Sequence, residues 1–487
     1  MTEPCDLSAV AARRLIGQKA LSPVELLQSC LKRIETANGA LNAFVAFDTA
    51  RAQKAAKAAE IRQMKGGLLG PLHGLPLGVK DLDATEGLRT TWGSRIYKDH
   101  VPKADALHIR NIRSAGGIVL GKTNTPEFGA GSNTTNAVYG ATGNPFDPAK
   151  TCGGSSGGSA VALATGMVPL ATGTDYGGSL RTPAAFCGVV GFRPSPGLVP
   201  FPARASGLSP FHVLGPIART VEDAYLLFKA EAGFDRGDLF SNSEGARLPD
   251  QLPEVDVSSL RAAISADLGC APLDRDIRKL FKGKVASFRH TFREAHDRDP
   301  DLGKVLDAFA VLRGLDFASE HRERLEKHRT LLGRNVIDNT ERGLKYTLAE
   351  VAWAQAEQTK IYQRFNALFD EADVLICPAT AVSPFPHAQL FVDEINGRKL
   401  PNYMSWYTIT YALSLAVPAI VVLPCGRDHL GMPFGIQVVG PNGSDARVLS
   451  IALALERVLA RNPETARPIP DLAKLSGPAA RRRGGKK

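Results

Sequence analysis

The first 65 residues carry apolar side chains at helical spacing. The segment SPVE at 22–25 combines an N-cap serine, a proline at the first helical position and a glutamate three residues after the cap, which together begin a helix. Residues 50–64 are rich in Ala, Lys and Gln. We predict two packing helices in this part of the chain. The apolar positions that recur on one face of the first helix are Leu26, Leu27, Leu31 and Ile34.

After residue 67 the pattern changes to short apolar runs. Residues 75–82, LPLGVKDL, predict a buried strand, residues 104–115 a helix and residues 117–122 a second strand. The later segment 271–372 is charged and has apolar positions at helical periods. We predict helices there, at Asp274–Leu280, Leu302–Arg313 and Thr347–Phe369.

A lysine, Lys80, lies inside the predicted strand at 75–82. An unpaired ammonium is costly to bury, and burial lowers its pKa. An ion pair with Asp81 or Asp83 is the simplest explanation of this residue when the strand is considered alone.

Residues 150–196 are the stretch around which we expect the chain to be organised. They hold two clusters of Gly and Ser, GGSSGGS at 153–159 and GGS at 177–179, joined by apolar and small residues. Glycine loses more backbone freedom on folding than any other residue. The clusters therefore indicate that backbone N–H groups approach something closely or that the chain needs positive φ.

Composition indicates a globular, soluble protein. The chain has 487 residues, 44% of them hydrophobic, which is enough for a large core. Its seven cysteines are odd in number and contain no C-x-x-C pair, so we predict free thiols in a reducing compartment. The N-terminus lacks the features of a signal peptide, and the longest apolar run, 412–425, is short and contains Pro418. We expect a cytoplasmic protein without a membrane segment.

The net charge of +10 is concentrated at the C-terminus. Half of it comes from five residues of a Gly-containing tail, so the rest of the chain is only mildly basic. We interpret the tail as a solubilising end and not as a nucleic-acid site. These five residues are Arg481, Arg482, Arg483, Lys486 and Lys487.

Two short sequence patterns occur in the chain, but the residues around them do not fit the structures in which these patterns function. Residues 116–123, GGIVLGKT, satisfy the phosphate-loop pattern, but the four middle residues are strand-like and Pro126 follows closely, so we reject nucleotide binding. Residues 153–157, GGSSG, fit the nucleophile elbow, which requires a hydrophobic strand immediately before it. The preceding residues, NPFDPAK at 144–150, predict a turn instead. Because no His or Cys spacing typical of a metal site occurs either, we predict no metal and no cofactor.

Residues 153–195, GGSSGGSAVALATGMVPLATGTDYGGSLRTPAAFCGVVGFRPS, are similar to the signature of the amidase signature family of serine hydrolases. The likeness covers most of the chain and is weakest between about 235 and 370. Five further segments support it: LHGLPLGVKD around Lys80, GGIVLGKTNTPEF at 116–128, GPIARTVEDA at 215–224, LICPAT at 375–380 and LPCGRDHLGMPFGIQVVGP at 423–441.

The resemblance implies a Ser–cis-Ser–Lys triad. Ser179 would be the nucleophile, Ser155 the bridging serine after a cis peptide at Gly154, and Lys80 the base. The remaining implied roles belong to the residues around these three. They are an oxyanion hole formed by the N–H groups of Tyr176, Gly177, Gly178 and Ser179, a pocket-lining position at Gly129, and supporting positions at Asp175, Arg181 and Ser156.

These assignments agree with elementary chemistry. A serine hydroxyl is a poor nucleophile until a base takes its proton, and a lysine with an ordinary pKa near ~10.4 can serve only if its site keeps it neutral. A shift of about three units corresponds to roughly 4 kcal/mol, which desolvation in an apolar strand can supply. Each oxyanion-hole donor is worth roughly 3 kcal/mol in the transition state.

The resemblance leaves the substrate open. We expect residues 271–372 to cover the pocket, with Trp406 and Tyr407, and less readily Trp353, as candidates for its lining. Tyr176 stands where a small residue, often Thr, is common in the family, and its ring is expected to narrow the leaving-group side. A small-molecule amide is the expected partner.

Other interpretations stay open. The same family includes the glutaminase subunit of tRNA-dependent amidotransferases and hydrolases that prefer esters or carbamates. Thr182 stands where that glutaminase usually has Gln, and GFRPSPGLVP at 191–200 replaces its usual Lys-Pro-Thr-Tyr-Gly run. Both differences favour a free-standing amidase. A non-enzymatic binding module is a further alternative, against which the joint presence of Lys80, Ser155 and Ser179 speaks.

The resemblance also implies the architecture. We expect a single α/β domain over 1–487, with a large mixed central sheet covered by helices on both faces. Dimerisation through the N-terminal helices is common in relatives and is expected here. We divide the domain into N-terminal helices at 1–66, a signature core at 67–235, a variable helical cover at 236–372, the C-terminal part of the core at 373–465 and a basic tail at 466–487.

Overall fold

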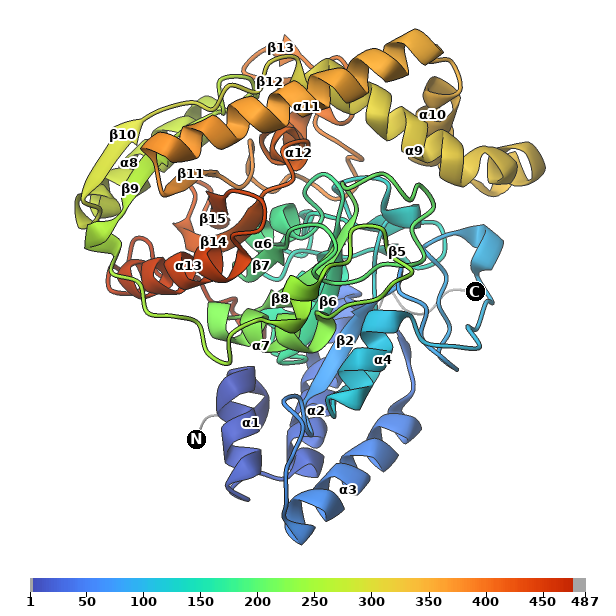
Figure 1. Cartoon of the computed structure of the whole chain (residues 1–487). Coiled ribbons are helices and arrows are strands. Elements are labelled where there is room, and N and C mark those ends of the chain that lie inside the picture. The colour runs from blue at the N-terminus through green and yellow to red at the C-terminus, as the bar shows by residue number, and fades with distance from the viewer. Residues whose placement is uncertain (1–2, 476–487) are drawn as a thin grey trace.

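The computed structural model describes residues 3–475, and the basic tail positions beyond Leu475 lie outside them. It contains a mixed sheet of eleven strands in the order β1-β3-β2-β6-β8-β7-β14-β15-β11-β9-β10 (Figure 1). The strands are β1 (Phe44–Phe47), β2 (Pro76–Lys80), β3 (Ile118–Thr123), β6 (Leu170–Asp175), β7 (Val190–Arg193), β8 (Val213–Ala218), β9 (Arg261–Ile264), β10 (Glu294–Asp297), β11 (Val374–Pro378), β14 (Ala419–Arg427) and β15 (Pro433–Gly440). Two separate hairpins are β4 (Thr135–Asn136) with β5 (Gly140–Ala141) and β12 (Glu394–Ile395) with β13 (Arg398–Lys399).

Helices cover both faces of this sheet, because its central strands are buried on both sides and present apolar side chains to each layer. One face is packed by α2 (Pro23–Leu41), α3 (Thr49–Lys65), α5 (Gly157–Ala164) and α6 (Arg181–Cys187). The other is packed by α1 (Ala9–Gly17), α4 (Leu107–Ser114), α7 (Val221–Glu231) and α13 (Asp445–Ala460). The fold is therefore the expected α/β arrangement.

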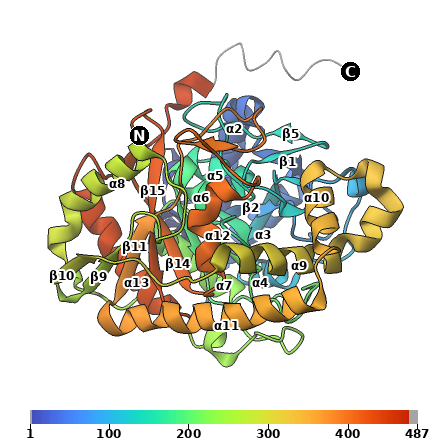
Figure 2. The same ribbon diagram turned by 90° about the horizontal axis from the view of Figure 1, so that it is seen from above.

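The remaining helices form a group at one end of the molecule. Figure 2, seen from above, shows α9 and α11 side by side, and α9 also packs against α10 and α12. This end of the fold covers the sheet edge at which the candidate site lies. The helices of the group are α9 (Val305–His328), α10 (Arg334–Gly343), α11 (Leu348–Glu371) and α12 (Thr408–Ser414), while α8 (Arg275–Phe288) lies beside β9 and β10.

Local signals in the sequence correspond closely to the observed elements. The capping box at Ser22 and Glu25 is formed, and α2 begins at Pro23 as expected. The predicted strand at 75–82 is β2, and the predicted helix at 104–115 is α4. The GGIVLGKT segment forms β3 and not a loop that opens into a helix. The segment 236–372 supplies the expected helices but also β9 and β10, which the helical periods do not indicate.

The sheet brings the signature residues together through one parallel pair of strands. β2 and β6 are parallel neighbours, so their carboxyl ends meet at the same edge. Lys80 is the last residue of β2, and Asp175 is the last residue of β6. The glycine-rich turns that precede α5 and α6 close over this edge.

Two general observations limit the chemistry of the described part of the chain. All seven cysteines are free thiols. Between residues 3 and 475, no helix is long and apolar enough to cross a membrane, and no group of three or more His, Cys, Asp or Glu side chains could hold a metal ion.

Gly191 in β7 provides a test of how tightly the sheet holds the turn before α6. A Cβ atom at Gly191 would lie 2.4 Å from the carbonyl oxygen of Leu180, the residue that precedes α6. We expect Gly191→Ala to lower the free energy of unfolding by about 1–3 kcal/mol through overpacking.

Gly283 is the matched control, since a Cβ atom there meets nothing within 4 Å in the middle of α8. Gly283→Ala should instead stabilise the protein by about 0.5–1 kcal/mol. Urea unfolding of both variants measures the difference, and equal effects would show that the Gly191 contact is not restrictive.

Candidate active site

The amine of Lys80 lies at the centre of the site. Its side chain is fully buried, and Nζ donates hydrogen bonds to Ser155 Oγ at 2.7 Å, Ser156 Oγ at 2.8 Å and Thr174 Oγ1 at 2.8 Å. In the part of the chain that the structure describes, no carboxylate lies within 4 Å of Nζ. The ion pair that would explain Lys80 as a structural residue is therefore not formed.

The surroundings of Lys80 favour the neutral amine. Burial lowers its pKa to about 7, and the negative charges of Asp83 and Asp175 oppose this effect without cancelling it. Hydroxyl groups satisfy the hydrogen-bonding capacity of the amine without supplying a full countercharge. Near neutral pH, an appreciable fraction of Lys80 can therefore accept a proton.

The two neighbouring carboxylates have other partners. Asp81 accepts hydrogen bonds from the hydroxyl of Thr91, at 2.6 Å, and from its backbone N–H. Asp83 Oδ2 accepts from Thr172 Oγ1 at 2.9 Å and lies 3.4 Å from His108 Nε2. These contacts hold both carboxylates in fixed positions that do not pair with Lys80.

Ser155 and Ser156 precede α5, and the peptide bond between Gly154 and Ser155 is cis, as the resemblance implies. Gly154 lies against another segment of backbone, because a Cβ atom there would be 2.9 Å from the Ser132 carbonyl carbon and 3.0 Å from the Asn133 nitrogen. Any side chain at this position would displace the 131–133 segment.

Ser179 occupies the turn between β6 and α6 and is partly exposed. It lines a pocket of about 450 Å³, together with Ser155 and Gly129. Within residues 3–475 the Ser179 and Ser155 hydroxyls do not form a hydrogen bond with each other. The structure thus contains the link between Lys80 and Ser155, and it brings Ser179 to the same cavity.

Gly129 stands where a side chain would obstruct this cavity. Its φ is +71°, and a Cβ atom would lie 3.3 Å from Ser155 Oγ and 3.1 Å from Leu82 Cδ1. The position lines the pocket as expected.

Asp175 fixes the turn that carries Ser179. Its carboxylate is fully buried and receives Arg181 Nη2 at 2.9 Å, Arg193 Nη1 at 3.0 Å and the N–H groups of Gly178 and Leu180 at 2.9 and 3.0 Å. The two guanidinium groups hold the pKa of this carboxyl well below its usual range, although burial acts in the opposite direction. Asp175 and Arg181 therefore have the bracing positions that the resemblance implies, while Arg193 was not anticipated.

One member of the expected oxyanion hole has a different partner. The Gly178 N–H donates to Asp175 Oδ1 and so is directed away from the pocket. The N–H groups of Tyr176, Gly177 and Ser179 have no hydrogen-bond partner among the described residues. Three of the four expected donors are thus available, and Gly178 instead stabilises the turn.

Tyr176 forms part of the pocket wall. Its hydroxyl donates to Asp316 Oδ2 at 2.7 Å, and its ring packs edge-on against Phe211 and Phe309. Because Asp316 belongs to α9, this hydrogen bond joins the turn that carries Ser179 to that helix. The ring itself occupies space on one side of the pocket.

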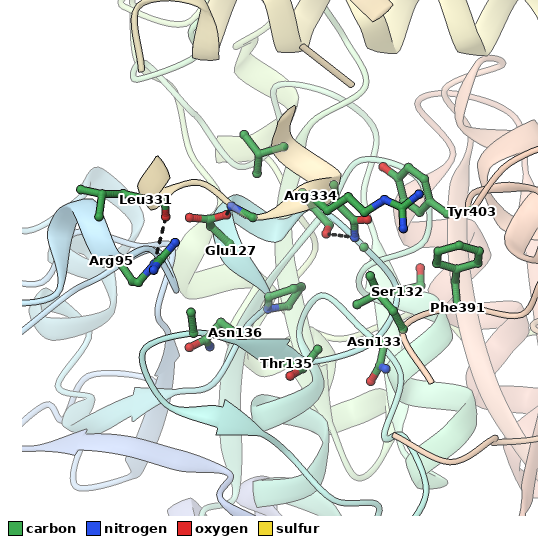
Figure 3. A pocket seen from close by; sticks show the side chains of 18 of the residues that line it. Arg95, Glu127, Ser132, Asn133, Thr135, Asn136, Leu331, Arg334, Phe391 and Tyr403 are labelled. Atoms are coloured by element: carbon green, nitrogen blue, oxygen red, sulfur yellow. Dashed lines mark hydrogen bonds between the residues drawn. The ribbon is translucent and has the colours of Figure 1, made fainter. Parts of the chain in front are cut away.

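The three aromatic candidates for the pocket lining lie elsewhere. Trp406 lines a second, smaller pocket of about 120 Å³, whose wall also includes Phe391 and Tyr403 (Figure 3). Tyr407 is buried next to Trp406 and lines neither of these two pockets, and Trp353 is 37% exposed on α11. The prediction that these three residues line the Ser179 pocket is therefore wrong.

Several site residues carry weak sequence signals. Thr172 and Thr174 occupy alternate positions of β6, and both accept hydrogen bonds from Lys80. Thr172 Oγ1 accepts from the backbone N–H of Lys80, and Thr174 Oγ1 accepts from its Nζ. Polar residues at period two in an otherwise buried strand could have indicated this contact. Arg193, which also pairs with Asp175, carries no comparable local pattern.

Comparison with known proteins is consistent with this geometry. A family model described as Amidase matches residues 25–449. Acylamidase from Rhodococcus erythropolis is 32% identical over 93% of this chain and 95% of its own length, and a glutamyl-tRNA(Gln) amidotransferase subunit from Anaeromyxobacter dehalogenans is 34% identical over 96% of this chain and 99% of its own length. A solved bacterial aryl acylamidase of the amidase signature family superposes with a TM-score of 0.84 at 30% identity, covering 94% of this chain and 96% of that one.

Removal of the Asp175 carboxylate tests its structural role. Asp175→Ala would leave Arg181 and Arg193 as buried cations without their common partner, so we expect a loss of about 3–5 kcal/mol in the free energy of unfolding. Asp99→Ala is the matched control, because its side chain is 81% exposed and lies 3.9 Å from Lys98. It should change stability by less than about 1 kcal/mol. Equal effects in chemical denaturation would contradict the bracing role of Asp175.

Proposed function

The chain belongs to the amidase signature family, and from this premise we propose that it hydrolyses the C–N bond of a small-molecule carboxylic amide through an acyl intermediate on Ser179. Products are a carboxylate and an amine or ammonia. Ser155 and Lys80 act with Ser179 as the catalytic residues, and no cofactor takes part in the proposed steps.

The proposed acylation begins with attack of Ser179 Oγ on the substrate carbonyl carbon. The proton of Ser179 passes to Ser155, whose own proton passes to the neutral amine of Lys80. The Ser179 and Ser155 hydroxyls are not hydrogen-bonded to each other in the structure, so this step requires the two oxygens to approach. When the tetrahedral intermediate collapses, the C–N bond breaks and the proton returns through Ser155 to the leaving nitrogen.

Deacylation repeats the same steps with water. The water loses a proton through Ser155 to Lys80 and attacks the acyl ester, and Ser179 takes its proton back as the carboxylate leaves. The negative charge on the carbonyl oxygen is stabilised by the N–H groups of Tyr176, Gly177 and Ser179, each worth roughly 3 kcal/mol in the transition state.

The observation that supports this proposal most directly is the environment of Lys80. A fully buried amine with a pKa of about 7, bound to Ser155 Oγ at 2.7 Å and free of an ion pair among the described residues, has the properties of a general base. Structural lysines are normally exposed or paired with a carboxylate. Ser179 and Ser155 line one cavity, which gives the amine a path to a substrate.

A glutaminase that acts only inside an amidotransferase is the second candidate, because the curated relatives include glutamyl-tRNA(Gln) amidotransferase subunits. Thr182, in the position that such a glutaminase usually fills with Gln, favours the free-standing amidase. Preference for an ester or carbamate, a cytoplasmic location and a homodimer remain predictions of the sequence.

Covalent labelling tests the assignment of the nucleophile. The purified chain should react with a fluorophosphonate probe at Ser179 alone, and Ser179→Ala should abolish both labelling and amide hydrolysis while the melting temperature is retained. Ser206→Ala is the matched control, because Ser206 lines the same pocket and should remain labelled and active. Activity of the Ser179→Ala variant would refute the proposal. In the same assay, hydrolysis of glutamine but of no simple amide would favour the glutaminase.

The pH dependence tests the role of Lys80. Its pKa in the folded protein is lowered to about 7, so the neutral, proton-accepting form increases as pH rises through that value. For an amide without ionisable groups, kcat/KM should fall about tenfold for each unit of pH well below 7 and reach a plateau above it. Lys80→Met should remove the activity. A rate that is flat from mildly acidic to alkaline pH would contradict a lysine base.

A further inference from the structure

Arg313 on α9 lines the Ser179 pocket and has unusual surroundings for a buried cation. Its side chain is only 6% exposed, yet no carboxylate of residues 3–475 lies within 4 Å of its guanidinium group. Its hydrogen-bond partners are neutral: Nε donates to Asn339 Oδ1 at 3.3 Å, and Nη2 donates to the hydroxyl of Tyr403 at 3.2 Å. Buried charges without a countercharge are expensive.

The other two arginines of this pocket differ from Arg313 in this respect. Arg204 lies 3.5 Å from the carboxylate of Asp238, and Arg324 lies 3.8 Å from that of Glu320. Each also donates to backbone carbonyl groups. Their charges are therefore neutralised within the protein, and that of Arg313 is not.

One nitrogen of Arg313 is left for a ligand. Nη1 has no hydrogen-bond partner among the described residues. It is also accessible, because it is not among the fully buried nitrogen and oxygen atoms that lack a partner. Asn339 and Tyr403 hold the rest of the guanidinium group, and Tyr403 also forms the wall of the second pocket (Figure 3). Nη1 is therefore the guanidinium nitrogen that remains available to a ligand of the Ser179 pocket, which Arg313 lines.

Two aromatic rings fix the orientation of Arg313. Its guanidinium carbon lies 4.6 Å from the centre of the Phe317 ring and 5.4 Å from that of Tyr176. Tyr176 is three residues before Ser179, so one aromatic ring separates the cation from the turn that carries the nucleophile. Arg313 and Ser179 thus contribute to the wall of the same pocket.

The nearest acid on α9 does not neutralise this charge. Asp316 Oδ2 accepts hydrogen bonds from Tyr176 and Ser209, and burial raises the pKa of this carboxyl in spite of the attraction of Arg313. Asp316 thus binds the Tyr176 hydroxyl, and its carboxylate lies more than 4 Å from the Arg313 guanidinium group.

We propose that Arg313 binds a carboxylate group carried by the amide substrate, away from the bond that is cleaved. This inference rests on the proposed amidase function and specifies its substrate class. A carboxylate oxygen accepts a charge-assisted hydrogen bond from Nη1 and supplies the missing countercharge. One guanidinium group without a countercharge matches the single negative charge of a carboxylate, whereas a dianionic phosphate would exceed it.

The experiment compares matched substrates with the purified full-length chain. Glutaryl p-nitroanilide carries a carboxylate in the acyl part, and hexanoyl p-nitroanilide has a similar length without the charge. A second pair, 4-acetamidobenzoate and acetanilide, carries the charge in the amine part. We expect kcat/KM to favour the charged member of at least one pair by tenfold or more, and the pair that responds identifies the side of the scissile bond that Arg313 contacts.

Substitution separates binding of the charge from a purely structural role. Arg313→Gln should lower kcat/KM for the preferred charged substrate at least tenfold and leave the uncharged one within about threefold, a loss equivalent to about 1.4 kcal/mol or more. Arg313→Lys should retain part of the preference. Arg324→Gln is the matched control, since it removes a pocket arginine already paired with Glu320 and should leave the preference unchanged.

The outcomes are distinguishable. No preference for either charged substrate in the unmodified protein would overturn the inference, whether or not the variants fold, and so would equal losses on charged and uncharged substrates in Arg313→Gln and Arg313→Lys. If the unmodified protein hydrolysed none of the four amides and Ser179 remained unlabelled by the fluorophosphonate probe, the proposed function itself would fail. Hydrolysis of the uncharged amides alone would refute only the role of Arg313.

Discussion

The rest of the site depends on the hydrogen bonds that join a buried lysine amine to three hydroxyl groups. The hydroxyl groups satisfy the hydrogen-bonding capacity of the amine without supplying a negative charge. Burial therefore lowers the pKa of Lys80 to about 7. A carboxylate in the same place would have kept the lysine charged. The contacts that hold Asp81 at Thr91 and Asp83 at Thr172 therefore matter as much as those of Lys80 itself.

The site combines this uncharged cluster with a fully charged one next to it. Asp175, Arg181 and Arg193 form a buried ion network in which two guanidinium groups share one carboxylate. Such a network is rigid because breaking any of its contacts leaves a buried charge unpaired. The fold thus holds the turn that carries Ser179 with buried charges, and it surrounds the amine of Lys80 with uncharged hydroxyl groups. Both clusters lie at one sheet edge because β2 and β6 are parallel neighbours.

Much of this arrangement could be predicted from the sequence, because its signals are local. The capping box of α2, the strand around Lys80 and the Gly–Ser clusters around Ser155 and Ser179 each occupy a few consecutive residues. The family resemblance supplied the roles, and the structure brings those residues to one cavity.

What the sequence did not indicate comes from contacts between distant segments. Arg193 reaches Asp175 from another strand, and β9 joins the sheet by pairing with β11, more than a hundred residues later. The Gly178 N–H points to the Asp175 carboxylate, and residue propensities do not predict such a contact between a side chain and the backbone. The prediction for Trp406 is wrong for the same reason, since its ring stacks on Phe186 of α6, which is more than two hundred residues earlier in the chain.

The hydrogen bond between Tyr176 and Asp316 has an evolutionary consequence. Together with the contacts of Phe309 and Arg313 with the Tyr176 ring, it attaches the turn that carries Ser179 to α9, a helix that begins more than a hundred residues after Ser179. Substitutions on α9 therefore change the wall of the Ser179 pocket and leave the hydrogen bonds of Lys80 in the sheet in place. A gene encoding this fold can diversify its repertoire of substrates by drift in one helix while purifying selection preserves the chemistry in the sheet.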